Sequence, residues 1–252
     1  MRTMLIGGLL ALLALAAPVA AIQAQAPRQT DLFPPVAFRG VTALARYFYL
    51  AQAVIEYGPG AFSAAGSEQS LRYFTVLEGE LTFTVAGKQA SYAAGKSFSV
   101  APGIIVRGSN EGRGSRARVF VSSLVPARGD EPLMVSGTGS SSPAPRVVCA
   151  SRRAMGPLPQ TIDVVQWGRR YDPGFATPPH IMNEAHDVLH LEGTTSYEYV
   201  DGGAETYGPC QRAEMYVGQP GRMANRTAVP SIFFVTWLAG PGKPLTSAWQ
   251  GH

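Results

Sequence analysis

Three of the four histidines of this chain lie close together, between positions 180 and 190. His180 and Met182 are separated by one residue, and His186 follows shortly after them. Because side chains alternate between the two faces of a strand, His180 and Met182 are expected to project to the same side. A turn before His186 would begin a returning strand, and cross-strand neighbours lie about 5 Å apart. The spacing therefore predicts a metal centre formed by His180, Met182 and His186.

The residue types in this cluster limit the metals that it could bind. Imidazole together with a thioether suits copper, especially Cu(I), whereas the carboxylate of Glu184 would shift the preference toward iron, manganese or zinc. His190 lies too far along the strand to share the ion, since four strand residues span roughly 13 Å. In such a centre Glu184 or His190 would move a proton. The alternative is that these histidines are satisfied polar side chains in a core.

Short strands surround this cluster. Residues 81–85 and 97–100 alternate apolar and polar side chains, and residues 119–121 form a largely β-branched run. Turn signals that contain Gly or Pro fall at 57–60, 86–87, 94–95 and 102–103. Outside the N-terminal segment there is no long helical periodicity, although residues 41–55 are ambiguous. This spacing is typical of an all-β sandwich or barrel.

The strand pattern occurs twice. The segment from Tyr171 to Gly174 resembles that from Tyr57 to Gly60, and Leu191-Glu-Gly193 repeats Leu77-Glu-Gly79 after the same interval of 20 residues. A Gly-, Ser- and Pro-rich run at 136–145, typical of a linker, separates the two series. The repetition predicts an internal duplication.

The N-terminus has the features of a secretory signal peptide. Arg2 precedes an apolar stretch from Met4 to Ala17, and small residues follow it. We therefore predict a signal peptide over residues 1–24 and a periplasmic or secreted protein. An uncleaved anchor over Met4–Ile22 is the alternative. No other segment is apolar enough to span a membrane, so no membrane association is expected after cleavage.

Charge and cysteine content narrow the partners. The net charge is +4, but the positive residues are scattered, with no basic stripe of the kind that tracks phosphates, so nucleic acid is not an expected partner. In an oxidising compartment Cys149 and Cys210 can form one disulfide. The alternatives are that both are buried and inert or that they bind metal, although a distant pair lacks metal-ligand spacing.

Two segments of the first half carry a resemblance to a known family. Residues 76–85 resemble the strand and turn after the first metal motif of the cupin superfamily, and Gly95, Gly103 and Asn110 are in register with its second motif. The similarity covers most of residues 45–125 and is strong again over 171–200. It implies two antiparallel cupin barrels, or double-stranded β-helices, in one chain. The expected organisation is a first barrel at 30–127, a linker at 128–160 and a second barrel at 161–252.

The resemblance also implies where metal ligands would stand. In the first half the ligand positions fall on or near Gly66, on Glu68 or Ser67, on Arg72 and on Val106, and no histidine occurs there. The first barrel is therefore expected to be metal-free, with Arg72 and Arg107 as candidate contacts for an anionic ligand. In the second half His180, Met182 and His186 reproduce the first-motif spacing, whereas the second motif, around 217–225, lacks a histidine.

Three functions are compatible with these features. The first is an exported metal-dependent enzyme on a small organic molecule, like the dioxygenases, decarboxylases and isomerases of the superfamily, with one copper, iron, manganese or zinc ion in the second barrel. The second is a non-catalytic periplasmic protein that binds a small ligand. The third is a structural or assembly protein, since cupin barrels commonly pair into homodimers. The fold alone does not separate these functions.

Overall fold

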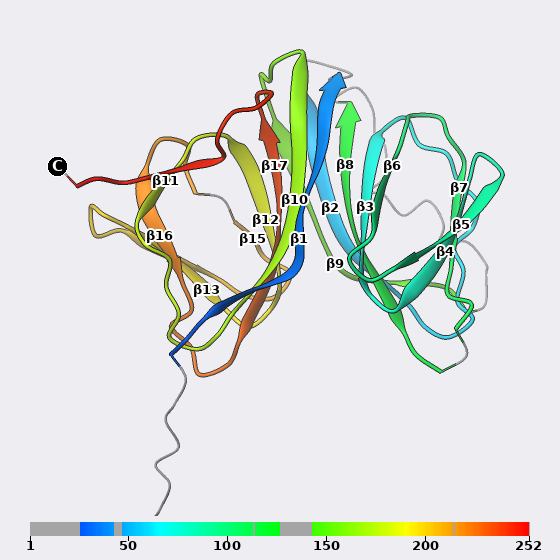
Figure 1. The fold of residues 1–252 in the computed structure, drawn as a ribbon, viewed down its shortest axis with the longest axis horizontal. Coiled ribbons are helices and arrows are strands. Elements are labelled where there is room, and N and C mark those ends of the chain that lie inside the picture. The colour runs from blue at the N-terminus through cyan, green and yellow to red at the C-terminus, as the bar shows by residue number, and fades with distance from the viewer. Residues whose placement is uncertain (1–25, 43–46, 113, 127–142, 214, 252) are drawn as a thin grey trace, which may run out of the picture.

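The structure is a computed structural model that describes residues 26–42, 47–112, 114–126, 143–213 and 215–251. Every regular element in these residues is a β-strand, and the strands form four sheets. The sheets make two barrels that lie side by side (Figure 1). The predicted all-β class with two antiparallel barrels is thus confirmed. The predicted signal peptide lies outside the described residues.

The first barrel consists of a five-stranded and a three-stranded sheet. In spatial order the large sheet contains β6 (Ser97–Val100), β3 (Leu71–Glu78), β8 (Ala117–Pro126), β2 (Phe48–Tyr57) and β9 (Arg146–Met155). The small sheet contains β5 (Lys88–Ala93), β4 (Glu80–Val85) and β7 (Val106–Ser109).

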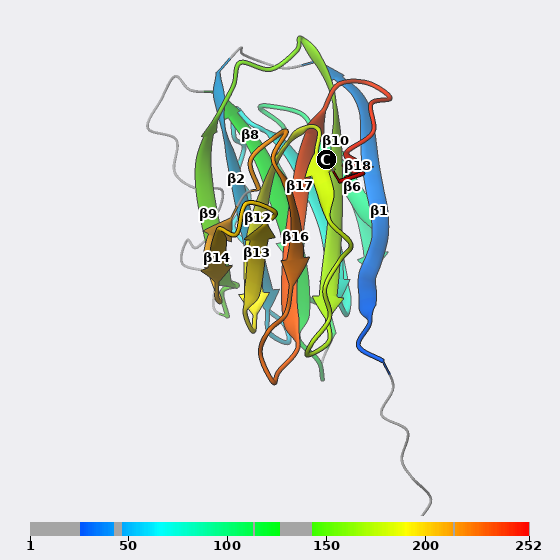
Figure 2. The same ribbon diagram turned by 90° about the vertical axis from the view of Figure 1, so that its left-hand side faces the viewer.

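The second barrel consists of two five-stranded sheets. Its large sheet contains β1 (Gln29–Thr42), β10 (Thr161–Tyr171), β17 (Ser231–Ala239), β12 (Ala185–Glu192) and β15 (Arg212–Ala213). Its other sheet contains β14 (Ala204–Tyr207), β13 (Thr195–Tyr199), β16 (Pro220–Ala224), β11 (His180–Met182) and β18 (Thr246–Ala248), and faces the viewer in Figure 2.

The two halves of the chain exchange strands. β1 precedes the first barrel in sequence but pairs with β10 of the second barrel along nearly its whole length. Reciprocally, β9 precedes the second barrel but pairs with β2 of the first. The predicted boundaries therefore need correction, because residues 29–42 belong to the second barrel and residues 146–155, placed in the linker, form a strand of the first. A sequence pattern identifies a strand but not the sheet that it joins.

The large sheets of the two barrels pack against each other. On β17 the side chains of Phe234, Thr236 and Leu238 face the first barrel, and the alternating side chains face the interior of the second. Both faces of the central strands are therefore covered, and eight of the nine residues of β17 are buried. This explains why these strands read as nearly continuous apolar runs.

Polar contacts across this interface follow an internal two-fold symmetry. The side-chain amide of Gln52 donates to the carbonyl of Asp187 (3.2 Å), and that of Gln166 donates to the carbonyl of Tyr73 (3.4 Å). Within each pair of equivalents, 52 with 166 and 73 with 187, the offset is 114 residues. Residues at the same offset also meet directly.

The direct contacts join one hydroxyl pair and one ring pair. The hydroxyl oxygens of Ser122 and Thr236 lie 2.6 Å apart, and the rings of Phe120 and Phe234 stack with centroids 4.9 Å apart. Both pairs have the same offset of 114 residues. The halves are therefore structural repeats, as the duplicated motifs predict.

One asparagine closes the same loop in each repeat. The amide of Asn110 donates to the carbonyls of Tyr57 and Ser115, and its oxygen accepts from the N–H of Gly112. In the second repeat Asn225 donates to the carbonyls of Tyr171 and Val229 and accepts from the N–H of Thr227. The motif asparagine is thus a structural residue in both barrels.

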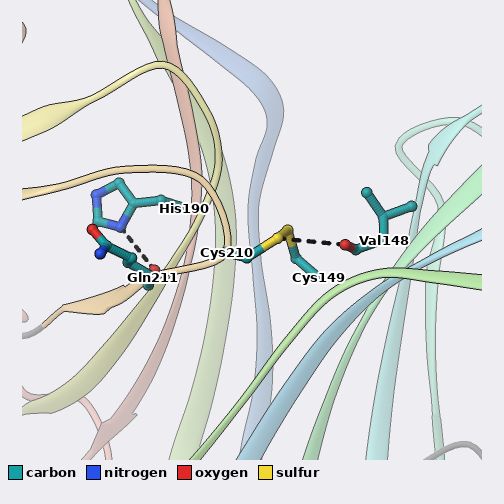
Figure 3. The surroundings of a disulfide bond; sticks show 5 residues. All are labelled: Val148, Cys149, His190, Cys210 and Gln211. Carbon is teal, nitrogen blue, oxygen red and sulfur yellow. Dashed lines mark hydrogen bonds between the residues drawn. A yellow bond between two sulfur atoms is a disulfide. The ribbon is translucent and has the colours of Figure 1, made fainter.

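A disulfide joins the two barrels. Cys149 lies on β9 in the large sheet of the first barrel, and Cys210 lies between β14 and β15 of the second (Figure 3). The predicted pairing is therefore present, and it links the halves in addition to the strand exchange. Among the described residues no helix is long and apolar enough to cross a membrane.

We expect reduction of this disulfide to lower the free energy of unfolding by about 3 to 4 kcal/mol, because it closes a long loop in the unfolded chain. Urea denaturation with and without dithiothreitol measures the change. A Cys149→Ser, Cys210→Ser variant should match the reduced protein and show no further response to the reductant. An unchanged unfolding midpoint upon reduction would contradict a stabilising role.

Two glycines that share a positive φ differ in the space around them, which gives a second prediction. Gly193 has φ +62°, and a Cβ there would lie 2.2 Å from the carbonyl oxygen of Pro230, whereas Gly60 has φ +72° with no atom within 4 Å. Gly60→Ala should lose roughly 1–2 kcal/mol through its backbone conformation alone. Gly193→Ala adds a backbone clash and should lose roughly 3 kcal/mol or more. Equal losses in chemical denaturation would be inconsistent with the close approach.

Candidate functional site

A cavity of about 270 Å³ lies inside the second barrel. Alternate residues of three strands of the large sheet face it, as the period of two requires. Strands β11 and β18 and the segment before β11 close the other side. It is lined by Trp167, Arg169, Tyr171, Thr177, Pro178, Pro179, His180, Met182, His186, Val188, Met223, Phe233, Val235, Trp237, Thr246 and Ala248.

The three predicted metal ligands all line this cavity. His180 and Met182 lie on β11, and His186 lies on β12. Strand alternation thus brings together side chains from two different sheets, as the sequence spacing predicts. Whether they can bind an ion depends on the hydrogen bonds of their donor atoms.

Both ring nitrogens of His186 are already engaged by the backbone. Nδ1 donates to the carbonyl of Glu184 (3.2 Å), and Nε2 accepts the N–H of Met215 (3.3 Å). The ring is buried and stacks on Trp237 with centroids 4.4 Å apart. Burial lowers the pKa of His186 to about 4, so the ring is neutral at pH 7. This histidine fixes the position of the backbone around it.

His180 retains one lone pair. Its Nδ1 lies 2.8 Å from the carbonyl oxygen of Pro178, so Nδ1 carries the proton and the lone pair is on Nε2. Together with the thioether of Met182 it supplies two donor atoms. Within the described ranges no three His, Cys, Asp or Glu side chains gather in a way that could hold a metal ion. Methionine is not among these residue types, so the fit of the predicted centre of His180, Met182 and His186 depends on its donor atoms. The residues present do not fit it, because both ring nitrogens of His186 are hydrogen-bonded to the backbone.

The two predicted proton-transfer residues do not line the cavity. The carboxylate of Glu184 accepts the N–H of Gly240 (3.2 Å). His190 is fully buried, and its Nδ1 donates to the carbonyl of Gln211 (3.2 Å), next to the disulfide (Figure 3). Its ring lies among Tyr197, Tyr207 and Phe233. The structure does not bring Glu184 and His190 to a common reaction site.

The two arginines predicted for anion binding are also apart. Arg72 is buried in the first barrel, where its Nη2 donates to the carbonyl of Ile104 (2.7 Å) and its Nη1 lies 4.0 Å from Glu68. Arg107 is exposed, with its guanidinium 4.7 Å from the centre of the Phe62 ring. Arg72 occupies the position of His186 in the other repeat, and it forms an internal ion pair there.

The interior of the first barrel is filled by aromatic rings. Phe74 stacks on Phe98 with centroids 4.7 Å apart, and Phe83 packs against both. At the repeat offset of 114 residues, Phe74 corresponds to Val188, which lines the cavity of the second barrel. The smaller side chain leaves space on that side. The candidate site is therefore in the second barrel.

This architecture is similar to that of known proteins. The family model described as "Cupin domain" matches residues 53–123, the main part of the first barrel. Solved structures with two such barrels superpose on most of the chain. The chain has the bicupin fold.

Three solved structures illustrate the similarity of this chain to known proteins. Bacillus subtilis oxalate decarboxylase, whose Mn(II) centres were studied, is 11% identical, with 88% of this chain and 77% of that chain covered and a TM-score of 0.55. The formate complex of Lactobacillus farciminis oxalate decarboxylase is 10% identical, with 87% of this chain and 88% of that chain covered and a TM-score of 0.54. The vicilin of Solanum melongena, with anionic ligands in its pockets, is 11% identical, with 80% of this chain and 78% of that chain covered and a TM-score of 0.58. No curated protein sequence matches this chain significantly.

Sequence reasoning missed two residues that line the cavity, Arg169 and Trp237. Arg169 lies between Trp167 and Tyr171 on the cavity face of β10, and Trp237 lies on β17. The period of two that brings His180 and Met182 to one face of a strand also identifies Arg169 and Trp237 as facing the interior. Their cross-strand neighbours, however, follow only from the fold.

The buried state of His190 predicts a pH dependence of stability. Burial lowers its pKa to about 4, below the 6.5 expected in the unfolded chain, so the stability present above pH 6.5 is lost as the pH falls toward 4. The loss between pH 7 and pH 5 should be roughly 2 kcal/mol for this histidine. In urea denaturation His190→Phe should show a correspondingly smaller pH dependence. The same pH dependence in both proteins would contradict a neutral, buried His190.

Proposed function

We propose that this chain is a non-catalytic binding protein whose second barrel holds a small organic molecule. The observation that carries the proposal is the cavity of about 270 Å³, lined mainly by aromatic, aliphatic and proline side chains. Concave, largely apolar sites with a few polar groups are typical of small-molecule binding. Strands supply most of the lining residues, so the cavity is largely pre-formed.

The hydrogen bonds around the cavity favour binding over catalysis. An acid or base must reach the reacting atoms, yet neither Glu184 nor His190 lines the cavity. His186 lines it, but both of its ring nitrogens are used by the backbone. His180 and the aromatic side chains remain to position a ligand.

Polar atoms without partners give further support. Among the described residues, the indole N–H groups of Trp167 and Trp237 have no hydrogen-bond partner although they are buried, and both side chains line the cavity. A buried unpaired donor costs free energy. A ligand with acceptor atoms would relieve part of that cost, which an apolar occupant would not.

The proposal includes export. The signal-like pattern over residues 1–24 supports a periplasmic or secreted location, as does the disulfide between the barrels, because disulfides persist in oxidising compartments. The ligand would then be a molecule of the cell envelope or the medium.

Blocking the cavity tests the proposal. Thr246 and Ala248 on β18 line the cavity, whereas Ser247 between them does not. Ala248→Trp should fill the cavity and weaken binding of 2-naphthamide, a neutral planar probe, at least tenfold in isothermal titration calorimetry. Ser247→Trp places the same side chain on the opposite face and should bind like the wild type.

Two results would overturn the proposal. The first is a wild-type protein that binds no member of a set of small planar probes, 2-naphthamide included. The second is stoichiometric copper, iron, manganese or zinc in the purified protein that disappears in the His180→Ala, His186→Ala variant. That result would favour the metal-dependent enzyme.

A further inference from the structure

One charged side chain lies in the otherwise largely apolar cavity. Among the described residues that line it, Arg169 is the only Arg, Lys, Asp or Glu. At the repeat offset of 114 residues, its equivalent in the first barrel is Ile55, which is buried in the core. The charge is therefore a feature of the second barrel and not of the shared architecture.

The surroundings of Arg169 hold its guanidinium beside an aromatic ring. Its central carbon lies 4.1 Å from the centre of the Trp167 ring, a cation–π contact. Trp167 in turn packs edge-on against Trp237 with centroids 5.6 Å apart. The charge and two indole rings thus lie next to each other on one wall of the cavity.

The counter-ion of Arg169 comes from the exchanged strand. Asp31 on β1 is its direct cross-strand neighbour, and its Oδ1 lies 3.3 Å from Nε of Arg169. The Asp31 side chain is 42% exposed and that of Arg169 only 22%. An ion pair with such an exposed partner contributes little and is screened by salt. The contact is on Nε, so this ion pair does not use the Nη groups of the guanidinium.

We propose that the cavity takes an organic carboxylate with a planar apolar body, with its carboxylate on Arg169. The inference rests on the proposed binding function and adds the class of ligand. A guanidinium presents a planar set of donors that matches a carboxylate, and no carboxylate among the described lining residues competes inside the cavity. The planar body packs against the indole rings.

A pair of probes with the same shape tests the charge. In calorimetric titrations at pH 7, 2-naphthoate should bind the wild type about tenfold or more tightly than 2-naphthamide, as expected for a charge-assisted hydrogen bond. Arg169→Gln should bring the two affinities within about threefold by weakening the naphthoate complex, with the naphthamide affinity retained.

Two further variants act as controls. Arg170 is the next residue on β10, pairs with Asp172 at 3.2 Å and does not line the cavity. Arg170→Gln removes the same charge nearby and should keep the preference for naphthoate. Asp31→Asn removes the exposed counter-ion and, because that ion pair contributes little, should keep the preference for naphthoate over naphthamide.

The outcomes separate the two proposals. If neither probe binds the wild type, the binding function itself fails. If both bind equally well, the function stands and the carboxylate inference is overturned, as it is if Arg170→Gln loses the preference as fully as Arg169→Gln. Should Arg169→Gln unfold by circular dichroism, the comparison of the two probes on the wild type decides, and equal affinities there overturn the inference.

Discussion

The exchange of strands between the two halves of the chain is the constraint on which the rest of the structure depends. Each large sheet is completed by a strand from the other repeat, β1 in one direction and β9 in the other. Neither half contains all the strands of its own barrel. The exchange holds the large sheets face to face, so that their outer surfaces become an interior. There two equivalent glutamines each donate to a backbone carbonyl of the other barrel, and two phenylalanines stack. The disulfide adds a covalent link to the same arrangement.

Because one face of each large sheet is fixed in the interface, the other face can differ between the barrels. In the first barrel this face carries phenylalanines that close the interior, and Arg72 pairs with Glu68. In the second, Val188 and His186 take the equivalent positions of Phe74 and Arg72, and a cavity remains. The duplication thus supplies one barrel that is filled and one that is hollow.

The second cavity combines neutral and charged elements that have different origins. His186 is neutral because burial disfavours its charged form, and the backbone on both sides fixes its tautomer. Arg169 is the charged element, and the carboxylate opposite it belongs to the strand contributed by the first half. The first repeat therefore affects the electrostatics of a site that lies entirely within the other barrel. This link is a consequence of the strand exchange.

The sequence by itself determined the strand periodicity, the duplication and the resemblance to cupins, since alternation and turn residues are local properties. Alternation also placed His180, Met182 and His186 on one cavity. Only the tertiary structure decided that β1 and β9 change barrels, because pairing partners are chosen by long-range packing. It also decided that the N–H of Met215, distant in sequence, occupies the nitrogen of His186 that a metal would need. The pairing of Arg169 with Asp31 joins residues far apart in the chain, and no local pattern encodes such a contact.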